Sequence, residues 1–497
     1  MKIYTVKLIL LIIFMLVIIR KILIEYLVCL VSKNISEKVT LINIKDFENK
    51  VQKISNQVKN SNNKIRLKRS NTSHLFGLKI LDSKNTIDLT KFNQIIEFNP
   101  KKKFIRVGGN TNLLQLILFL KENCHGLKVI PDMDHLTIGG LYAGIGGGAR
   151  TFKCGAFFNS VMKVEIVTGN GEILLCDKNH NSEMFELLPS TLGSLGYALS
   201  LWLEIEQIKK YVFSETYQYD NFEDFLHNIK KLMKDTSIDF LDGTIFNPKK
   251  FVIIIGKQTN LKSSYKLYGK KLGITYYEMV EKGYKGIFEY YDFIYRWDVD
   301  GYYSFIGDEW YLKLLRNKYI RKILDKRLFS ETKLRNLGKI FGINSVDSKN
   351  QIKGFVGDFM IPIDNSLKYY KWFEENGNDC YPIYICPINF KTKSPFIKTD
   401  KISIDFGIGY GVDPKNMSRD NRVSYLRKCM LKAYELNGDM LKYNSIYKNS
   451  DEFWKFYPKE LKCKYNELKN KYDRKGNFYS IADKLSLEEH KSGKGSE

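Results

Sequence analysis

The most apolar part of the chain lies at its N-terminus. Leu8–Ile19 is an unbroken run of twelve apolar residues, and Ile22–Val31 continues it after Arg20 and Lys21 with a single charged residue. A membrane span needs about 20 apolar residues, a length that this segment reaches if its basic side chains extend to the interface. We therefore expect an uncleaved transmembrane helix within residues 1–33. A signal peptide without a clear cleavage motif and a buried amphipathic helix are the alternatives.

In residues 35–206, some segments have the apolar spacing of a helix and others have the alternation of a strand. Residues 35–62 are polar and compatible with a helix, and the apolar spacing of Asn110–Cys124 predicts a helix that Asn110 or Thr111 caps. Alternating apolar and polar residues between turn signals predict strands and hairpins. These are a strand within Lys64–Gly77, hairpins over Ile95–Gly109 and Val161–Cys176, and a strand within Thr191–Glu206.

The rest of the chain again alternates strands and helices and is richer in Tyr, Trp and charged residues. The pattern as a whole predicts an α+β fold. We place the first folded domain at residues 34–208, a second at 209–485 and a disordered tail at 486–497.

The amino-acid composition excludes few classes of binding partner. Of 497 residues, 44% are hydrophobic and 27% charged, as in ordinary globular proteins. The net charge of +24 would suit nucleic acid or an anionic membrane. However, the basic residues are spread along a chain that is also rich in Asn, Ile and Tyr, which indicates a general bias toward Lys, and we expect no nucleic-acid partner. The eight cysteines include no CxxC pair, and the histidines show no ligand spacing, so we expect free thiols and no metal site.

Seven glycines crowd into the 23 residues of His135–Phe157, "HLTIGGLYAGIGGGARTFKCGAF". Predicted ordered elements flank this glycine block, which argues against a linker. It lacks the strand and ribose-binding acid of a Rossmann fingerprint and the G-K-[ST] of a P-loop. Small-residue loops on one α+β domain suit a dinucleotide whose diphosphate accepts hydrogen bonds from backbone N–H groups.

The block and the segment after it, "LTIGGLYAGIGGGARTFKCGAFFNSVMKVEIVTGNGEILLC" with "LPSTLGSLGYALSLWLEI", resemble the FAD-binding domain of the vanillyl-alcohol oxidase (PCMH) class. Within that class the chain is most similar to the delta-24 sterol reductase (24-dehydrocholesterol reductase) family. Five downstream stretches resemble that family's cap domain in its order: "YDFIYRWDVDGYYSF", "GDFMIPIDNSLKYYKWF", "YPIYICPI", "ISIDFGIGYG" and "DEFWKFY". The resemblance implies a two-part FAD-binding domain over 34–208, a cap or substrate domain over 209–485 and the N-terminal anchor.

The resemblance also implies the residues that hold FAD. Thr137–Ala149 would wrap the diphosphate and ribityl chain, a first phosphate turn would lie near Arg69, and two glycine turns would approach the isoalloxazine. The implied set is Arg69, Thr72, Ser73, Thr137, Ile138, Gly139, Gly140, Leu141, Tyr142, Ala143, Gly144, Ile145, Gly146, Gly147, Gly148, Ala149, Gly155, Gly193 and Gly196.

Two features depart from the family's pattern. The block is richer in glycine, and His74 follows the first phosphate turn. Some relatives in the wider class attach FAD covalently through a histidine in this turn. For His74 we expect a hydrogen-bonding or surface role instead.

The family reduces an isolated C=C bond in a sterol side chain with NADPH, so the resemblance implies FAD, NADPH and a sterol-like lipid. Hydride goes to one carbon, and the other needs a proton from an acid near the flavin. The candidates are Tyr295, Arg296 and Asp298, with Asp300 close by. Arg296 is equally explained as the ion-pair partner of one of these aspartates, and the surrounding aromatic residues as plain core.

Two other classes of function stay open: an FAD-linked oxidase that uses O₂, and a scaffold without flavin, against which the intact glycine block argues. The excess of basic residues after the apolar run favours a single-pass protein with a cytoplasmic body, at the endoplasmic reticulum in a eukaryotic host. The sequence indicates neither the particular substrate nor the oligomeric state.

Overall fold

The computed structural model describes residues 39–69, 85–133, 135–261, 264–265, 267–268, 275–297, 356–376, 380–408, 419–444 and 446–487, together with 19, 22–23 and 26. The predicted transmembrane helix lies almost wholly outside these residues, as do Thr72, Ser73, His74 and Asp298. Within the described part, no helix has the length and apolar character needed to cross a membrane.

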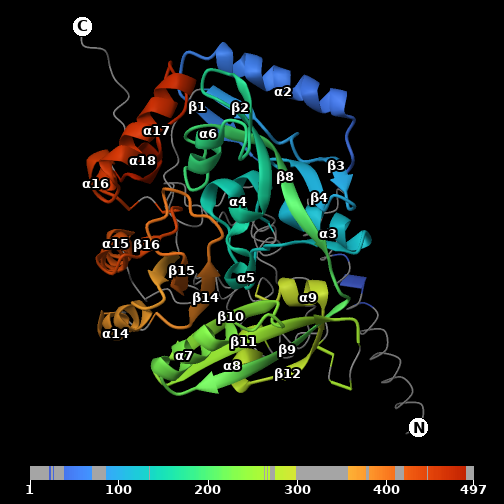
Figure 1. Cartoon of the computed structure of the whole chain (residues 1–497), viewed down its shortest axis with the longest axis vertical. Coiled ribbons are helices and arrows are strands. Elements are labelled where there is room, and N and C mark those ends of the chain that lie inside the picture. Colours follow the sequence, from blue (N-terminus) through green and yellow to red (C-terminus); the bar gives the residue numbers. More distant parts are fainter. Residues whose placement is uncertain are drawn as a thin grey trace, which may run out of the picture.

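The first domain is built on an antiparallel sheet in the order β3-β4-β8-β6-β7, with β5 beside β8. A separate parallel pair, β1 and β2, lies under the long helix α2, which crosses the outside of the domain (Figure 1). The elements are α2 (Ile44–Lys59), β1 (Ile65–Lys68), β2 (Asn85–Asp88), β3 (Ile95–Asn99), β4 (Phe104–Gly108), α3 (Leu113–Glu122), β5 (His125–Leu127), α4 (Ile138–Gly144), α5 (Thr151–Cys154), η2 (Phe157–Ser160), β6 (Val161–Val167), β7 (Ile173–Cys176), α6 (Ser182–Leu187) and β8 (Tyr197–Gln207).

The hairpins and helices predicted for this region are present. β3 pairs with β4 and β6 with β7, as the turn signals indicated. The N-cap of α3 was predicted one or two residues too early. Asn112 caps this helix by accepting hydrogen bonds from the N–H groups of Leu114 and Gln115 at 3.0 and 3.3 Å. Thr111 is instead part of the turn before the helix, where its N–H donates to Gly108.

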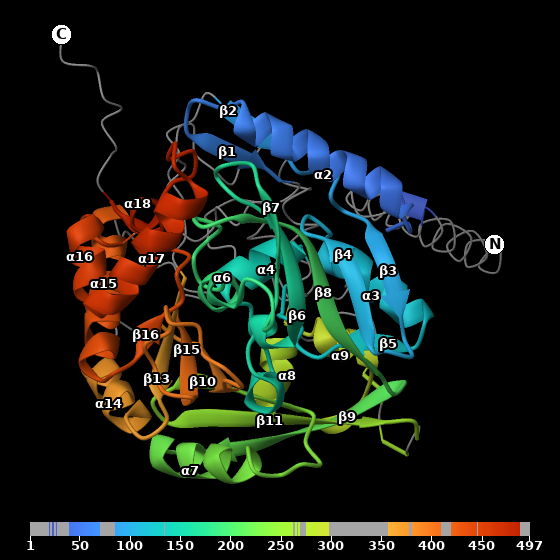
Figure 2. The ribbon, with the colours of Figure 1, turned by 45° about the horizontal axis from the view of Figure 1, so that its top comes forward.

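The second domain is an eight-stranded antiparallel sheet in the order β12-β9-β11-β10-β14-β15-β13-β16. Helices cover its outer face; α7 lies beneath the sheet in Figure 2. Its elements are β9 (Tyr211–Tyr219), α7 (Phe222–Leu232), β10 (Phe240–Asn247), β11 (Lys250–Thr259), α8 (Tyr276–Lys282), β12 (Lys285–Glu289), α9 (Tyr290–Ile294), β13 (Gly357–Pro362), α14 (Ser366–Asn376), β14 (Ile383–Asn389), β15 (Ile402–Ile408), α15 (Arg419–Glu435) and β16 (Asp439–Met440). The mixed helix and strand content confirms the predicted α+β class.

The two faces of this second sheet differ sharply in polarity along β10, β14, β15 and β13. Side chains alternate between faces along a strand, and cross-strand partners share a face. The outer face, against α7, α14 and α15, is apolar; on it Tyr369 of α14 packs on Phe406 at 5.1 Å between ring centroids. The register places the opposite residues on the inner face: Asp242, Thr244, Tyr384, Cys386, Ser403, Asp405, Asp358 and Met360.

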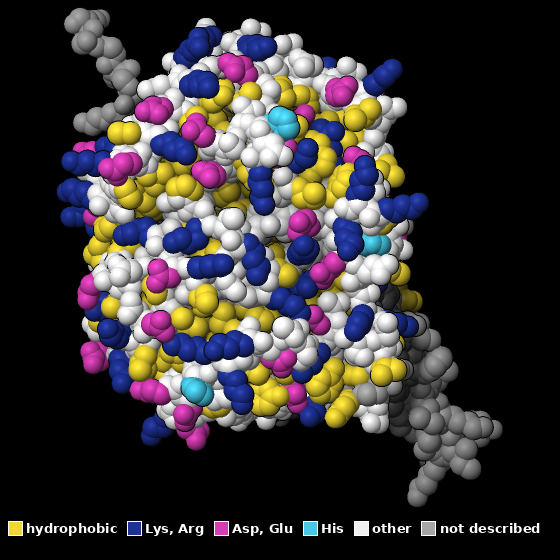
Figure 3. All heavy atoms as spheres, viewed as in Figure 1, with side chains coloured by type: hydrophobic (Ala, Val, Ile, Leu, Met, Phe, Trp, Pro, Cys, Tyr) yellow, Lys and Arg dark blue, Asp and Glu magenta, His cyan; other side chains and the backbone are white. Residues whose placement is uncertain are grey.

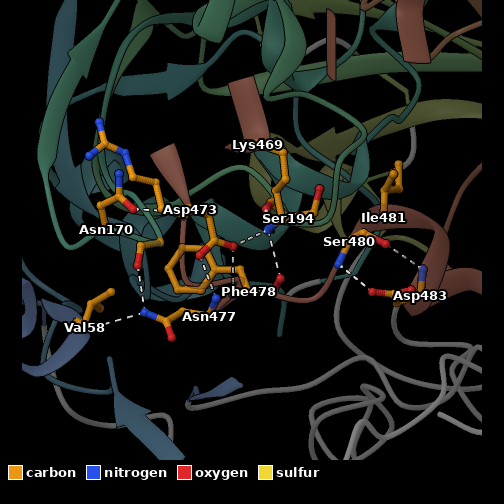
Figure 4. Close-up of polar contacts among 12 residues, drawn as sticks. Val58, Asn170, Ser194, Lys469, Asp473, Asn477, Phe478, Ser480, Ile481 and Asp483 are labelled. Carbon is orange, nitrogen blue, oxygen red and sulfur yellow. Dashed lines mark hydrogen bonds and ion pairs between the residues drawn. The ribbon is translucent and has the colours of Figure 1, made fainter. Parts of the chain in front are cut away.

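The C-terminal helices α16 (Ser450–Lys455), α17 (Lys459–Tyr472) and α18 (Ile481–Leu485) return to the first domain. The Asp473 carboxylate accepts hydrogen bonds from Lys469 and from the N–H groups of Asn477 and Phe478 (Figure 4). Lys469 also donates to the Ser194 carbonyl at 2.7 Å, and Asn477 to that of Gly169 at 2.9 Å. Residues beyond 450 therefore help to build the first domain. The boundary placed at 208/209 stays a prediction.

The basic side chains do not gather on the face of the molecule seen in Figure 3. Lys and Arg are scattered there among acidic and apolar side chains. Several are paired, as in the 2.7 Å contact between Lys230 and Asp364. This distribution agrees with a general bias toward Lys and with the absence of a dedicated polyanion surface on that face.

Candidate functional site

The glycine block folds into the short helix α4, a loop and the single turn α5. Ile145 ends α4 in the left-handed region, at φ 59°. Two of the glycines are required by packing within the protein. A Cβ at Gly148 would lie 2.4 Å from the Ile130 carbonyl oxygen, and one at Gly139 would lie 2.8 Å from that of Gly109.

Other glycines of the block face open space. A Cβ at Gly144 would meet no atom within 4 Å, and one at Gly147 would only touch the Thr151 methyl group at 3.4 Å. The N–H groups of Gly147, Gly148 and Ala149 donate to no acceptor within the described residues. The block thus combines room for a ligand with free backbone donors, which fits the predicted dinucleotide diphosphate.

The remaining predicted glycines make turns inside the protein. Gly155 has φ 81°, and a Cβ there would overlap the Asn159 side chain at 2.2 Å. A Cβ at Gly193 would meet the Tyr197 ring, and one at Gly196 the Ile166 side chain. The turn that contains Gly193 nonetheless borders the block, because the Leu192 N–H donates to the Ala143 carbonyl at 3.3 Å.

Basic side chains surround this turn. Lys484 of α18 donates to the Leu192 carbonyl at 2.8 Å, and its Nζ lies 5.3 Å from the centre of the Tyr197 ring. Burial and then the like charges of Lys469 and Arg69 lower the pKa of Lys484 to about 7. Arg69, directly after β1, is exposed but close enough to help lower the pKa of Lys484. Such a concentration of positive charge favours a nearby anion.

The glycine block meets the inner face of the second sheet directly. The Thr151 hydroxyl of α5 donates to the Pro387 carbonyl at 2.8 Å, and the Cys386 thiol donates to that of Gly148 at 3.2 Å. The Leu241 N–H donates to the Ala149 carbonyl at 2.7 Å. In Figure 1 α5 lies next to β14 and β10 of this sheet. The glycine block and the polar sheet face are therefore in direct contact.

Four aspartates converge there: Asp242, Asp358 and Asp405 on the sheet, and Asp132 on the loop that precedes the block. Asp242 is fully buried and paired with the guanidinium of Arg296, and it also accepts from the Trp297 indole N–H at 2.9 Å. Burial would lower the pKa of Arg296, but the Asp242 carboxylate outweighs this and holds the pKa above its ordinary value.

The other three aspartates form no ion pair within the described residues. Burial raises their pKa values, as it also raises that of Asp242. Burial raises the pKa of Asp132 to about 7, although the positive charge of Arg296 opposes the shift. Burial raises the pKa of Asp358 to about 6, against the effect of the Tyr443 hydroxyl that donates to it. For Asp405, burial and then the neighbouring Asp358 raise the pKa well above its ordinary value.

Of the predicted catalytic residues, Asp298 lies outside the described part of the chain, as does Asp300, so their grouping with Tyr295 and Arg296 stays a prediction. Arg296 is an ion-pair partner, as one alternative held, and its partner among the described residues is Asp242. Tyr295 is half-buried at the C-terminus of α9. Sequence reasoning missed the sheet aspartates, although each is a lone acid within an apolar strand, as in "FLDGTIF" and "ISIDFGI". Such an acid points to a buried polar site.

We expect Arg296→Leu to reduce the free energy of unfolding by about 3–5 kcal/mol, because it leaves the Asp242 carboxylate buried without its cation. Adding Asp242→Asn removes that charge and should restore part of the loss. Denaturant unfolding of both variants measures this. An Arg296→Leu protein with unchanged stability and lost turnover would contradict the structural role and favour a catalytic one.

Comparison with known proteins bears on this geometry. Residues 46–177 match the family model described as an FAD binding domain. The chain is 23% identical to the Delta(24)-sterol reductase of Mus musculus over 407 residues, which cover 79% of this chain and 76% of the relative. For the Arabidopsis thaliana Delta(24)-sterol reductase the identity is 23% over 448 residues, with coverages of 80% and 75%. Cytokinin dehydrogenase 1 of Arabidopsis thaliana is 27% identical over 149 residues, 30% of this chain and 26% of the relative.

These matches confirm the resemblance predicted from the motifs. The FAD-domain match contains the glycine block, and the similarity to the sterol reductases continues far beyond it. The chain therefore contains an FAD-binding domain over residues 46–177, and it resembles the Delta(24)-sterol reductases over 79% of its length.

Proposed function

We propose that the protein uses FAD and NADPH to reduce a C=C bond in the side chain of a sterol-like lipid. One observation carries the proposal: the glycine block directly contacts a buried sheet face that holds carboxyl groups of raised pKa. Saturating a double bond needs a hydride and a proton at neighbouring carbons, and this arrangement brings a cofactor cradle and proton-holding acids into one place.

In this proposal the chain holds FAD through Thr137–Ala149, whose free N–H groups at Gly147, Gly148 and Ala149 face the diphosphate. Arg69 adds positive charge at the side of the Leu192–Tyr197 turn. Thr72 and Ser73 remain proposed members of the first phosphate turn. Bound FAD would supply hydride transfer; the protein's part is to orient the two reactants, exclude water and hold the proton.

The walls beside the acids suit an apolar reactant. Trp297 packs edge-on against Tyr276 at 4.6 Å between ring centroids and against Tyr384 at 5.8 Å. Aromatic side chains offer a large apolar surface together with a few polar atoms, a combination that suits a rigid lipid with one reactive group. The names of the relatives support the same substrate class.

A lipid substrate also gives the N-terminal segment a purpose. Within this proposal, residues 1–33 anchor the enzyme in the membrane where the substrate is dissolved, with the folded body on the cytoplasmic side. Passage of such a lipid through water is unfavourable by about 0.8 kcal/mol for each CH₂ group exposed. An anchored enzyme takes up its substrate at the bilayer surface and avoids that passage.

Gly144→Val tests whether the glycine block binds FAD. Because a Cβ at Gly144 meets no protein atom within 4 Å, the chain should fold normally, whereas the added side chain takes up space proposed for FAD. We expect FAD affinity to fall at least tenfold, with the melting temperature of the FAD-free protein changed by less than a few degrees. Flavin fluorescence titration and thermal unfolding measure the two quantities.

Gly148→Ala is the matched control for a clash within the protein. Its Cβ would lie 2.4 Å from the Ile130 carbonyl oxygen, so this variant should lose stability even without FAD. Normal FAD affinity in Gly144→Val would show that the open side of the block does not face the cofactor.

The reaction itself is tested in two halves under nitrogen. NADPH should bleach the flavin of the membrane-bound, full-length protein, and a sterol with an isolated side-chain double bond should then restore the oxidised spectrum. The saturated form of the same sterol should not. A flavin that NADPH leaves oxidised, or a reduced flavin that only O₂ reoxidises, would contradict the reductase and favour the oxidase.

A further inference from the structure

The inner face of the second sheet offers a particular residue for the proton step, and this inference rests on the proposed function. We propose that Asp405 is the acid that protonates the double bond, and that Asp358, its neighbour on the same sheet face, keeps Asp405 in its acid form.

Strand pairing places the two carboxyl groups on one face. Asp358 lies opposite Gly407 and Asp405 opposite Met360 in the antiparallel β13–β15 pair, so the two aspartates are diagonal neighbours. Each has only 7% of its surface exposed. Two carboxylates held this close and away from water strongly resist being ionised together, so the pair retains a proton near neutral pH.

Asp405 lacks the hydrogen bonds that the Asp242 and Asp358 carboxyl groups accept. Its buried Oδ1 has no hydrogen-bond partner, and no hydrogen bond to its carboxyl group occurs within the described residues. Asp242 has Arg296 and Trp297, and Asp358 has the Tyr443 hydroxyl. A buried polar atom without a partner loses free energy unless a ligand or water meets it, so an orphaned oxygen indicates a place where a reactant binds.

The position of Asp405 connects it to the cofactor cradle. Cys386 lies directly opposite Asp405 in the β14–β15 pair, and the Cys386 thiol contacts the Gly148 carbonyl of the glycine block. One strand therefore separates Asp405 from the loop proposed to hold FAD. Asp242 is also on this face, but it lies on β10, two strands from Asp405, and is paired with Arg296.

The other titratable groups on or beside this face are either paired or neutral. Asp439 of β16, opposite Met360, is paired with Lys442 at 3.1 Å. Burial and then Asp405 hold the pKa of the Cys386 thiol well above its ordinary value, so Cys386 stays neutral. Burial, followed by Asp132, likewise keeps the Tyr384 phenol neutral. Within the described part of the chain, Asp358 is the one charged neighbour that shifts the pKa of Asp405.

The step balances with the reactants already named. The π electron pair of the C=C bond takes the proton as the O–H bond of the Asp405 carboxyl group breaks, and a new C–H bond forms. Bound FAD, reduced by NADPH, would supply the hydride for the second C–H bond at the neighbouring carbon. Asp405 is left as a carboxylate and regains its proton from water before the next turnover.

Asp405→Asn is the direct test, because the amide has the size and neutrality of the protonated acid but cannot deliver the proton. In the full-length, FAD-loaded enzyme under nitrogen, NADPH should reduce the flavin at the wild-type rate. Reoxidation by the unsaturated sterol should slow by about 100-fold or more, the usual contribution of a general acid. Asp400→Asn, at an exposed residue shortly before β15, is the matched control and should leave both rates unchanged.

Asp358→Asn supplies a second readout, which a purely structural role would not change. The sterol half-reaction needs the acid form, so its rate should be highest at low pH and fall as pH rises through the pKa of Asp405. Removing the negative neighbour lowers that pKa, so the fall should begin at a lower pH in Asp358→Asn than in the wild type. Should Asp405→Asn fail to fold, this shift still decides the question.

The outcomes separate the two proposals. A wild-type rate of sterol reduction in Asp405→Asn, or an unshifted pH profile in Asp358→Asn, would overturn the role of Asp405 and leave the reductase intact. Failure of the wild-type enzyme to pass electrons from NADPH to the sterol would instead overturn the proposed function.

Discussion

A carboxyl group removed from water must be paired with a cation, protonated or bound to a ligand. This constraint governs the inner face of the eight-stranded sheet, where β10, β13 and β15 each bury an aspartate. At Asp242 the constraint is met by pairing, through the fully buried Arg296 of the segment after α9. The neighbouring Asp358 and Asp405 meet it by retaining a proton between them, because burial raises both pKa values. One face thus contains both a buried ion pair and acids of raised pKa.

The glycine block packs against this face from the first domain. Gly148 and Gly139 let the loop pack against backbone oxygens of its own domain, while Gly144 leaves its outer side open. Contacts from Thr151, Cys386 and Leu241 then fix the loop against the sheet. The C-terminal helices contact the turn beside the block, where Lys469 and Lys484 donate hydrogen bonds to its carbonyl groups. Segments from the whole length of the chain therefore meet around one region.

Much of this organisation could be predicted from the sequence, and the failures share a cause. Local signals were sufficient for the hairpins β3–β4 and β6–β7 and the helix α3, because turn residues and apolar period act over short distances. The motifs around the glycine block were sufficient for the FAD-binding domain. The pairing of Arg296 with Asp242 spans 54 residues of chain and leaves no local signal. The neighbourhood of Asp358 and Asp405 likewise depends on the strand register of β13 and β15. A single Asp in an apolar strand indicates burial but does not identify its neighbours.

The central claim is that the open side of the glycine block and the acidic sheet face enclose one reaction chamber. An experimental structure of the purified flavoprotein with an unsaturated sterol bound tests it most directly. The account predicts the isoalloxazine between the glycine block and the second sheet, with the side-chain double bond of the sterol in contact with the face formed by Asp358, Tyr384 and Asp405. A flavin bound elsewhere, or a sheet face packed against the first domain with no space for a reactant, would contradict it.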